Sequence, residues 1–549
     1  MASGRRSGGT ILKSSPGTFS RFVCLTAGLV FASSAFAQQS VTVQTDHGAV
    51  VGQQTTARVF LGIPYAAPPV GPLRWRPPQP VPGWTSPLDA SKSGNGCPQV
   101  IQAQFAVPGQ TAGQVIGNED CLYLNVYAPQ AASTGSKFPV MVWIHGGAFT
   151  LGSGSDYDAS SFARKHGVVV VTLNYRLGAL GFLALPALTG EGGGASGNYG
   201  LLDQQTALKW VQANIAAFGG DPAAVTIAGE SAGGMSVCAH LASPASAGLF
   251  GKAIIQSGLC TSPGNAVTQT EAQARNLKYV AKLGCAPDDL DCLRKTDVSA
   301  LLKTAVPGLR TISNLVWSPV YQTPLLPLTL QDAFARGQVN KVPVMAGTNH
   351  DEGRLFVSVA APDGKPVTLI KYWGAAGLLA GIVKAQPVLA QYPYRTYTTP
   401  ALAFATMFTD GVFSCPAVSV DTALSKVVPV YAFEFNDPQA VTTQRVPVDL
   451  PGLGAFHTSG LAYVFQAPIP GIVNAYTFTP AQAALSEQFS SAWANFVKAG
   501  NPNPAGQTGW QAFDPARGNV QVFTPTSVRE STAFVTDHKC SFWKSLNLK

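Results

Sequence analysis

The residues most capable of chemistry lie in Thr226–Gly234, whose sequence is TIAGESAGG. Its central Gly-Glu-Ser-Ala-Gly fits the Gly-x-Ser-x-Gly pattern, in which a sharp turn between a strand and a helix exposes one serine hydroxyl. Glycines flank the serine because side chains there would collide with the neighbouring strand and helix. The apolar run Val225–Ala228 predicts the strand before the turn. We therefore expect Ser231 to act as a nucleophile.

A serine hydroxyl is a weak nucleophile at neutral pH, so it needs a histidine to accept its proton and a carboxylate to orient that histidine. The histidines after Ser231 are His240, His350, His457 and His538. His240 lies about two and a half turns along the predicted helix and is expected to be structural. His538 lies in a polar C-terminal segment. His457, in a loop after the last predicted strands, is the expected base.

The acid is expected in Val344–Gly353, where an apolar strand ends in a polar loop. From the residues alone, Asp351 and Glu352 are both candidates, and His350 is interpreted as only lining the loop. An ordinary solvated loop would also carry such charges. Only 12% of the residues are charged, so a group of charged residues at the end of a buried strand favours a functional role over an ordinary solvated loop.

The anionic intermediate of acyl transfer also needs hydrogen-bond donors. The segment Ile144–Phe149, IHGGAF, follows a buried strand and precedes the serine motif. A Gly-Gly pair alone is usually just a turn, but in this order it matches the donor loop of serine hydrolases. The backbone N–H groups of Gly147, Ala148 and Ala232 are the predicted donors.

Short apolar runs alternate with helical segments along the chain, which indicates an α/β protein with a mostly parallel central sheet and helices on both faces. Helical spacing is clear in Leu202–Phe218. Residues of about 265–335 and 355–425 are helix-rich and irregular, and we expect them to be insertions that roof the active site. Alternating residues at Val41–Val51 and Ala57–Leu61 predict a small sheet at the start of the chain. The other predicted strands lie at Leu122–Tyr127, Val140–Ile144, Val168–Leu173, Val225–Ala228, Lys252–Gln256, Val342–Ala346 and Val430–Phe435.

The N-terminus has the pattern of a secretory signal. Basic residues precede the apolar run Phe22–Phe36, which ends in Ala35-Phe36-Ala37. The run is too short for a stable membrane span. We predict a signal peptide at residues 1–37, cleavage near Ala37, and a secreted or periplasmic single domain at residues 38–549.

Charge and cysteine content narrow the class of protein further. Cleavage would remove four basic and no acidic residues, which lowers the net charge from +8 to +4 without leaving a basic block. Nucleic-acid binding is therefore not expected, and no other apolar run reaches membrane length. Of nine cysteines, eight would remain, an even number that indicates disulfides in an oxidising compartment.

Taken together, these motifs resemble the type-B carboxylesterase family, which includes the cholinesterases. The resemblance covers nearly all of the predicted mature chain and implies an α/β-hydrolase fold. It also implies Ser231 as nucleophile, Glu352 rather than Asp351 as acid, and His457 as base. The similar segments are Gly62–Gly71, Glu119–Asn125, Trp143–Phe149, Asn174–Gly178, Asp203-Gln204, Asn214–Pro222, the serine motif and Asn349–Gly353.

The resemblance implies further roles. Glu230 matches a family glutamate that acts electrostatically near the serine, which is compatible with a buried, hydrogen-bonded carboxylate. The implied disulfides are Cys97–Cys121, Cys285–Cys292 and Cys415–Cys540. Cys238 and Cys260 are left as either free buried thiols or a fourth bridge.

Departures from the family pattern bear on the substrate. The segment between Cys97 and Cys121 contains no tryptophan, the residue that binds quaternary ammonium in cholinesterases, and Phe105 is its only aromatic residue. Choline esters are therefore not expected as substrates. Gly460 stands where the family often has an acidic residue after the histidine. The segment Ser313–Trp317 resembles the wall of the acyl pocket in the family. Its small and aliphatic residues before Trp317 predict a roomy acyl pocket.

We therefore expect a secreted serine carboxylesterase that acts on small-molecule or polymeric esters through an acyl-serine intermediate. No metal or organic cofactor is expected, and the sequence gives no oligomeric state. The alternatives are a non-catalytic cholinesterase-like binding or adhesion module, and an amide or carbamate hydrolase with the same triad. The first alternative is disfavoured because the chain retains all three triad residues.

Overall fold

The computed structural model describes Leu12 and residues 39–304, 315–360 and 365–548. Apart from Leu12, the predicted signal peptide at residues 1–37 lies outside the described residues. So do Ser313 and Asn314 at the start of the predicted acyl-pocket segment. Residues 39–548 belong to one compact unit.

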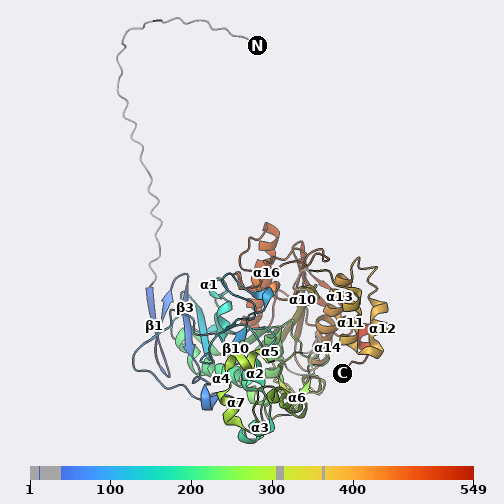
Figure 1. The fold of residues 1–549 in the computed structure, drawn as a ribbon. Helices are drawn as coiled ribbons and strands as arrows, with labels where there is room; N and C mark the ends of the chain where they lie inside the picture. Colours follow the sequence, from blue (N-terminus) through green and yellow to red (C-terminus); the bar gives the residue numbers. More distant parts are fainter. Residues whose placement is uncertain (1–11, 13–38, 305–314, 361–364, 549) are drawn as a thin grey trace. The chain divides into compact units, whose positions relative to one another are not determined.

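A thirteen-stranded sheet runs through this unit (Figure 1). Its order is β1-β2-β3-β7-β9-β8-β10-β11-β14-β15-β16-β17, and β4 pairs with β2. The neighbours from β9 to β16 are parallel, and the pairs at both edges are antiparallel. The prediction of a mostly parallel central sheet is confirmed. The strands are β1 (Gln39–Thr45), β2 (Gly48–Gln54), β3 (Ala57–Pro64), β4 (Leu88–Asp89), β7 (Tyr123–Pro129), β8 (Phe138–Ile144), β9 (Val169–Leu173), β10 (Gly220–Glu230), β11 (Lys252–Gln256), β14 (Val344–Asn349), β15 (Val430–Phe435), β16 (Val520–Thr524) and β17 (Ser527–Ser531).

Helices cover both faces of the sheet (Figure 1). Helices α5 and α16 both pack on β8 and β10. Along the sequence, helices α6–α9 come between strands β11 and β14, and helices α10–α14 come between β14 and β15. The helices are α1 (Ser160–His166), α2 (Gly178–Phe182), α3 (Pro186–Glu191), α4 (Tyr199–Asn214), α5 (Ala232–Ala242), α6 (Gln269–Ala281), α7 (Leu290–Lys295), α8 (Val298–Lys303), α9 (Leu330–Ala335), α10 (Gly353–Ala360), α11 (Leu369–Ala380), α12 (Ile382–Gln391), α13 (Pro400–Phe408), α14 (Cys415–Leu424), α15 (Gly460–Phe465), α16 (Pro480–Ala499), α17 (Phe534–Asp537) and α18 (Cys540–Ser545).

A buried ion pair fastens the loop after β9 to helix α4. Arg176 Nη2 lies 2.7 Å from Asp203 Oδ1, and the backbone N–H of Arg176 also donates to this carboxylate. The two side chains are 3% and 0% exposed. Removing one partner would leave a buried charge unpaired, which typically costs about 3–5 kcal/mol. Two of the family-like segments, Asn174–Gly178 and Asp203-Gln204, therefore have a structural role.

The structure contains four disulfides among the described residues. Three of them join Cys97 to Cys121, Cys285 to Cys292, and Cys415 to Cys540. The fourth joins Cys238 on α5 to Cys260, a pair that the sequence left open. All eight cysteines of the predicted mature chain are thus bridged, and Cys415–Cys540 ties the C-terminal helix α18 to α14.

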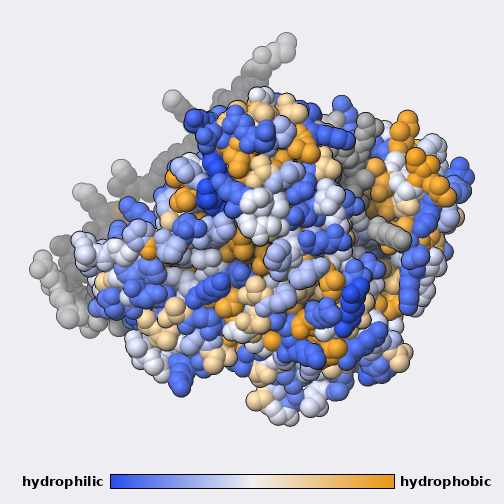
Figure 2. Space-filling view, turned by 90° about the horizontal axis from the view of Figure 1, so that it is seen from below, coloured by the Kyte–Doolittle hydropathy of each residue, from blue (hydrophilic) through white to orange (hydrophobic). Residues whose placement is uncertain are grey.

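One helical run, Pro400–Leu424, is long and apolar enough to span a membrane by length and composition. Its apolar stretch is 78% buried inside the protein, as in the core helix of a globular domain. Helices α11 and α12 form a bent apolar pair that leaves Ile370, Trp373, Ile382 and Val383 exposed. Figure 2 shows hydrophobic residues at the right-hand edge, where these helices lie.

Candidate active site

Ser231 occupies the turn between β10 and α5. Its backbone has φ +57° and ψ −121°, a conformation that is strained for a residue with a side chain. The neighbouring glycines allow the close packing of this turn. A Cβ at Gly229 would lie 2.5 Å from the backbone carbon of Gly233, and a Cβ at Gly233 would lie 2.0 Å from the carbonyl oxygen of Ile144. The predicted strand–turn–helix geometry therefore surrounds the serine.

This packing predicts that Gly233→Ala destabilises the protein. The added methyl would overlap a backbone carbonyl of the central strand β8, which cannot move aside, so we expect a loss of at least ~2 kcal/mol in unfolding free energy. Gly374→Ala is the matched control. Gly374 lies on the exposed face of α11 with open space around it, and alanine should stabilise the helix by ~0.5–1 kcal/mol. Urea unfolding of both variants measures the difference, and equal stability would contradict the prediction.

His457 and Glu352 are in hydrogen-bond contact. His457 Nδ1 lies 2.6 Å from Glu352 Oε2, and the two side chains are 6% and 0% exposed. The other carboxylate oxygen of Glu352 accepts hydrogen bonds from Ser257 Oγ at 2.5 Å and from the backbone N–H of Asn349 at 2.8 Å. Three donors therefore fix the orientation of the carboxylate that faces the imidazole.

The remaining nitrogen of the imidazole faces a second carboxylate. His457 Nε2 lies 3.2 Å from Glu230 Oε1, and within the described residues the Ser231 hydroxyl donates no hydrogen bond. Burial raises the pKa of Glu230 to about 7, although the charge of His457 opposes this. Burial lowers the pKa of His457, but the charges of Glu230 and Glu352 outweigh it and hold the pKa above the ordinary 6.5. The two carboxylates thus favour the imidazolium.

Two aromatic rings pack on the imidazole. The ring centroids of Phe356 and Phe413 lie 5.1 Å and 4.9 Å from that of His457. Phe413 belongs to a π-helical turn, Thr409–Ser414, between α13 and α14. Such turns occur frequently at functional sites because they redirect side chains from a helix. Neither these rings nor Ser257 could be predicted from the sequence, since each approaches His457 or Glu352 from a distant part of the chain.

The loop after β8 presents backbone donors beside the serine. Gly147 has φ +98°, and a Cβ there would lie 2.1 Å from the carbonyl oxygen of Leu151, so only glycine fits. Within the part of the chain that the structure describes, the N–H groups of Gly147, Ala148 and Ala232 donate to no other residue. Each is therefore free to donate to a ligand, and Gly147 and Ala148 line the same cavity as Ser231.

Comparison with known proteins assigns the family. The model of the carboxylesterase family matches residues 39–543. The chain belongs to the carboxylesterase family. Among its carboxylesterase relatives, the para-nitrobenzyl esterase of Bacillus subtilis (strain 168) is 38% identical over 484 residues, which are 86% of this chain and 92% of the relative. The fumonisin B1 esterase of Sphingopyxis macrogoltabida is 36% identical over 496 residues, 87% of this chain and 85% of the relative.

Solved structures agree with this assignment. The structure of a thermophilic PNB esterase has a TM-score of 0.78 and 35% sequence identity, and the match covers 91% of this chain and 99% of the other. The match covers most of the chain, so this carboxylesterase has the α/β-hydrolase fold and is a carboxylic ester hydrolase.

The carboxylesterase has a cavity of about 410 Å³ at the candidate site. Its wall includes Gln102 and Phe105 from the Cys97–Cys121 loop and residues from the segments before α9 and within α10. Among the residues that line it, Asp156 and Glu230 are the carboxylates, and most of the others are apolar or glycine. The lining residues are Gln102, Phe105, Gly146, Gly147, Ala148, Thr150, Leu151, Gly152, Asp156, Tyr157, Glu230, Ser231, Leu315, Val316, Leu355, Phe356, Val359, His457, Thr458, Ile469, Pro470 and Ile472.

Proposed function

We propose that this carboxylesterase is an exported serine esterase that cleaves uncharged esters through an acyl-serine intermediate. Ser231 is the nucleophile, His457 the base and Glu352 the acid that orients the base. The observation that carries the proposal is the 2.6 Å contact between His457 Nδ1 and Glu352 Oε2 in a cavity that also contains the strained Ser231.

The reaction begins when Ser231 Oγ attacks the ester carbonyl and His457 Nε2 accepts its proton. Because Nε2 lies near Glu230, the imidazole must turn from Glu230 towards Ser231 for this step. The N–H groups of Gly147, Ala148 and Ala232 donate to the oxyanion that forms. His457 then protonates the leaving alcohol, and water attacks the acyl-serine with His457 again as base.

The lining of the cavity supports uncharged substrates. Leu315, Val316, Leu355, Val359 and Ile472 give its wall aliphatic side chains, and none of the described residues that line it is a lysine or arginine. Phe105 contributes the aromatic ring of the Cys97–Cys121 loop, which has no tryptophan for a quaternary ammonium. We therefore expect aliphatic or aryl acyl groups to be accepted in preference to choline esters.

Covalent trapping tests the nucleophile. Diethyl p-nitrophenyl phosphate should inactivate the enzyme with release of one p-nitrophenolate per chain, and peptide mass spectrometry should find the diethylphosphoryl group on Ser231. Initial rates on p-nitrophenyl esters from acetate to palmitate, together with p-nitrobenzyl esters, then measure the preferred acyl size. Labelling of another residue, or no labelling with no turnover of any ester, would refute the proposal.

Export is part of the proposal and has its own test. The apolar run Phe22–Phe36 and the Ala-Phe-Ala at its end support a cleaved signal peptide. Protein recovered from the periplasm or culture medium should begin at Gln38 by N-terminal sequencing. Recovery of the uncleaved chain from the cytosol alone would contradict it.

The pH dependence of turnover should depend on Glu230. His457 must be neutral to accept a proton, and its pKa lies above 6.5, so kcat/KM should fall as the pH drops through a midpoint above 6.5. Glu230→Gln removes the nearest negative charge to Nε2, which lowers the pKa of His457 and moves the midpoint to lower pH. Rates between about pH 5 and 9, followed at the isosbestic wavelength of p-nitrophenol, measure both midpoints.

Asp156→Asn provides the matched control for this comparison. It neutralises the other carboxylate of the cavity wall, which has no contact with the imidazole, so the midpoint should stay at the wild-type value. Identical midpoints for wild type and Glu230→Gln would show that Glu230 is neutral throughout the range or that His457 is not the titrating base.

A further inference from the structure

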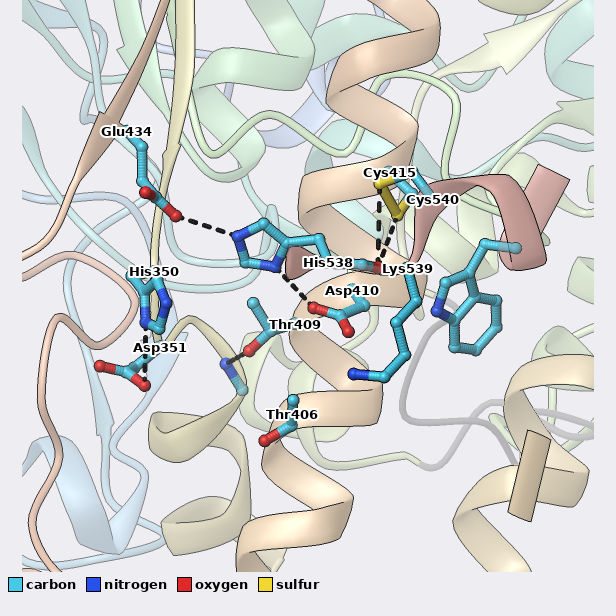
Figure 3. A network of polar contacts seen from close by, with 12 residues as sticks. His350, Asp351, Thr406, Thr409, Asp410, Cys415, Glu434, His538, Lys539 and Cys540 are labelled. Carbon is cyan, nitrogen blue, oxygen red and sulfur yellow. Dashed lines mark hydrogen bonds and ion pairs between the residues drawn. A yellow bond between two sulfur atoms is a disulfide. The ribbon is translucent and has the colours of Figure 1, made fainter. Parts of the chain in front are cut away.

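A second cluster of histidine and carboxylate side chains lies outside the cavity (Figure 3). It consists of His350, Glu434 and His538, and each residue offers one ligand atom within 4.8 Å of the other two. His350 follows strand β14, Glu434 lies on β15, and His538 ends helix α17. Three segments that are distant in sequence therefore bring two imidazoles and one carboxylate together.

An aspartate contacts the Nδ1 side of each imidazole. His538 Nδ1 lies 2.6 Å from Asp410 Oδ1, and His350 Nδ1 lies 3.4 Å from Asp351 Oδ1 (Figure 3). The Nε2 atoms are the remaining ligand atoms, and His538 Nε2 lies 2.9 Å from Glu434 Oε1. Histidines that bind metals usually have this arrangement, with a carboxylate on the nitrogen that does not face the metal.

We propose that His350, Glu434 and His538 bind one divalent transition-metal cation such as Zn²⁺. Two imidazole nitrogens and one carboxylate oxygen form a donor set suited to Zn²⁺, with water as the fourth ligand. Asp410 and Asp351 orient the two imidazoles. The proton shared between His538 and Glu434 leaves to solvent when the cation takes its place.

The distances require only a small adjustment. Tetrahedral zinc with bonds of about 2.1 Å places its ligand atoms ~3.4 Å apart. His538 Nε2 and Glu434 Oε1 therefore need to separate slightly, and His350 needs to approach them. The His350 side chain is 41% exposed and can move, whereas those of Glu434 and His538 are 7% and 5% exposed. The cation can therefore enter from the solvent-exposed side at His350, and His350 is the ligand that can move to bind it.

The site would connect the C-terminal segment to the sheet. His538 lies two residues before Cys540, which forms a disulfide with Cys415 (Figure 3). Asp410, which contacts His538, belongs to the π-helical turn Thr409–Ser414 that directly precedes Cys415. Bound metal would add a cross-link between β14, β15 and the C-terminus. Because the cation binds the folded state, it should raise the melting temperature.

Zinc binding by the untagged protein tests the site. After treatment with a chelator and its removal, equilibrium dialysis against Zn²⁺ should give one ion per chain with Kd of about 10 µM or tighter. His350→Gln should weaken binding at least tenfold, since it removes one of three ligands. Zinc should raise the melting temperature of the wild type by about 1–2 °C and leave that of His350→Gln unchanged.

His47→Gln is the matched control, because His47 is also an accessible histidine beside an aspartate, Asp46, but far along the chain from this cluster. It should bind zinc like the wild type. Equal binding by wild type and His350→Gln, or no bound ion in either, would overturn the proposal and leave the cluster as a hydrogen-bonded link. Circular dichroism of His350→Gln checks that it folds, and His350→Ala is the second variant if it does not.

Discussion

Ser231→Ala is expected to lower kcat for an activated p-nitrophenyl ester by at least ~10³-fold. The substitution removes the oxygen that would form the acyl bond. Thr150, Tyr157 and Thr458, the other described hydroxyl side chains of the cavity, do not directly join a strand of the sheet to a helix as Ser231 does. The proposed oxyanion donors and the cavity remain, so a small residual rate is expected. Initial rates and single-turnover experiments with enzyme in excess measure the loss.

The stability of Ser231→Ala separates a chemical effect from a folding effect. Within the described residues the hydroxyl of Ser231 donates no hydrogen bond, so the melting temperature should stay close to that of the wild type. Ser161→Ala on α1 is the matched control, because Ser161 lies outside the cavity and should keep the wild-type kcat. A Ser231→Ala variant that retains more than about a tenth of the wild-type kcat would exclude this serine as the nucleophile.

The parts of the site that the sequence predicts are those encoded in continuous segments. The strand β10, the glycines around Ser231 and the helix α5 follow one another within a few residues, and the donor loop follows β8 directly. Apolar runs bounded by turns located the central strands well, and β11 and β15 have the predicted bounds. Local pattern is informative here because buried parallel strands must be apolar throughout.

The features that the sequence did not predict depend on contacts between distant segments. Ser257 donates to Glu352 across 95 positions, and His538 binds Asp410 and Glu434 across 128 and 104 positions. His350 was interpreted as only lining its loop, whereas the structure brings it to Glu434 and His538. Nothing in the local sequence marks such partners. The choice between Asp351 and Glu352 likewise needed the family resemblance, because both follow the same strand.

The C-terminal strands β16 and β17 were missed for another reason. β16 and β17 form a C-terminal hairpin. Three of the five residues of β16 are buried, whereas β17, at the edge of the sheet, has no fully buried residue. Its sequence, SVRES, is polar apart from one valine. Edge strands with one solvated face carry too few apolar residues to stand out from loops.

Glu352→Gln is expected to lower kcat on the order of 10³-fold or more, because it stabilises the tautomer of His457 that cannot act as the base. Ser257 Oγ and the Asn349 N–H both donate to Oε1, so the amide oxygen of glutamine must take that position. The amide NH₂ then faces His457 Nδ1 and requires it to accept a hydrogen bond. The proton of the neutral imidazole would move to Nε2, which could no longer accept a proton from Ser231.

Asp351→Asn is the matched control, since it makes the same change one residue earlier in the same loop. Asp351 accepts a hydrogen bond from the backbone N–H of Ala455 and pairs with Arg354, and it has no contact with the imidazole of His457. We expect its kcat to stay within about tenfold of the wild type. Because the two variants differ only in which carboxylate is neutralised, a larger loss in Asp351→Asn than in Glu352→Gln would transfer the orienting role to Asp351.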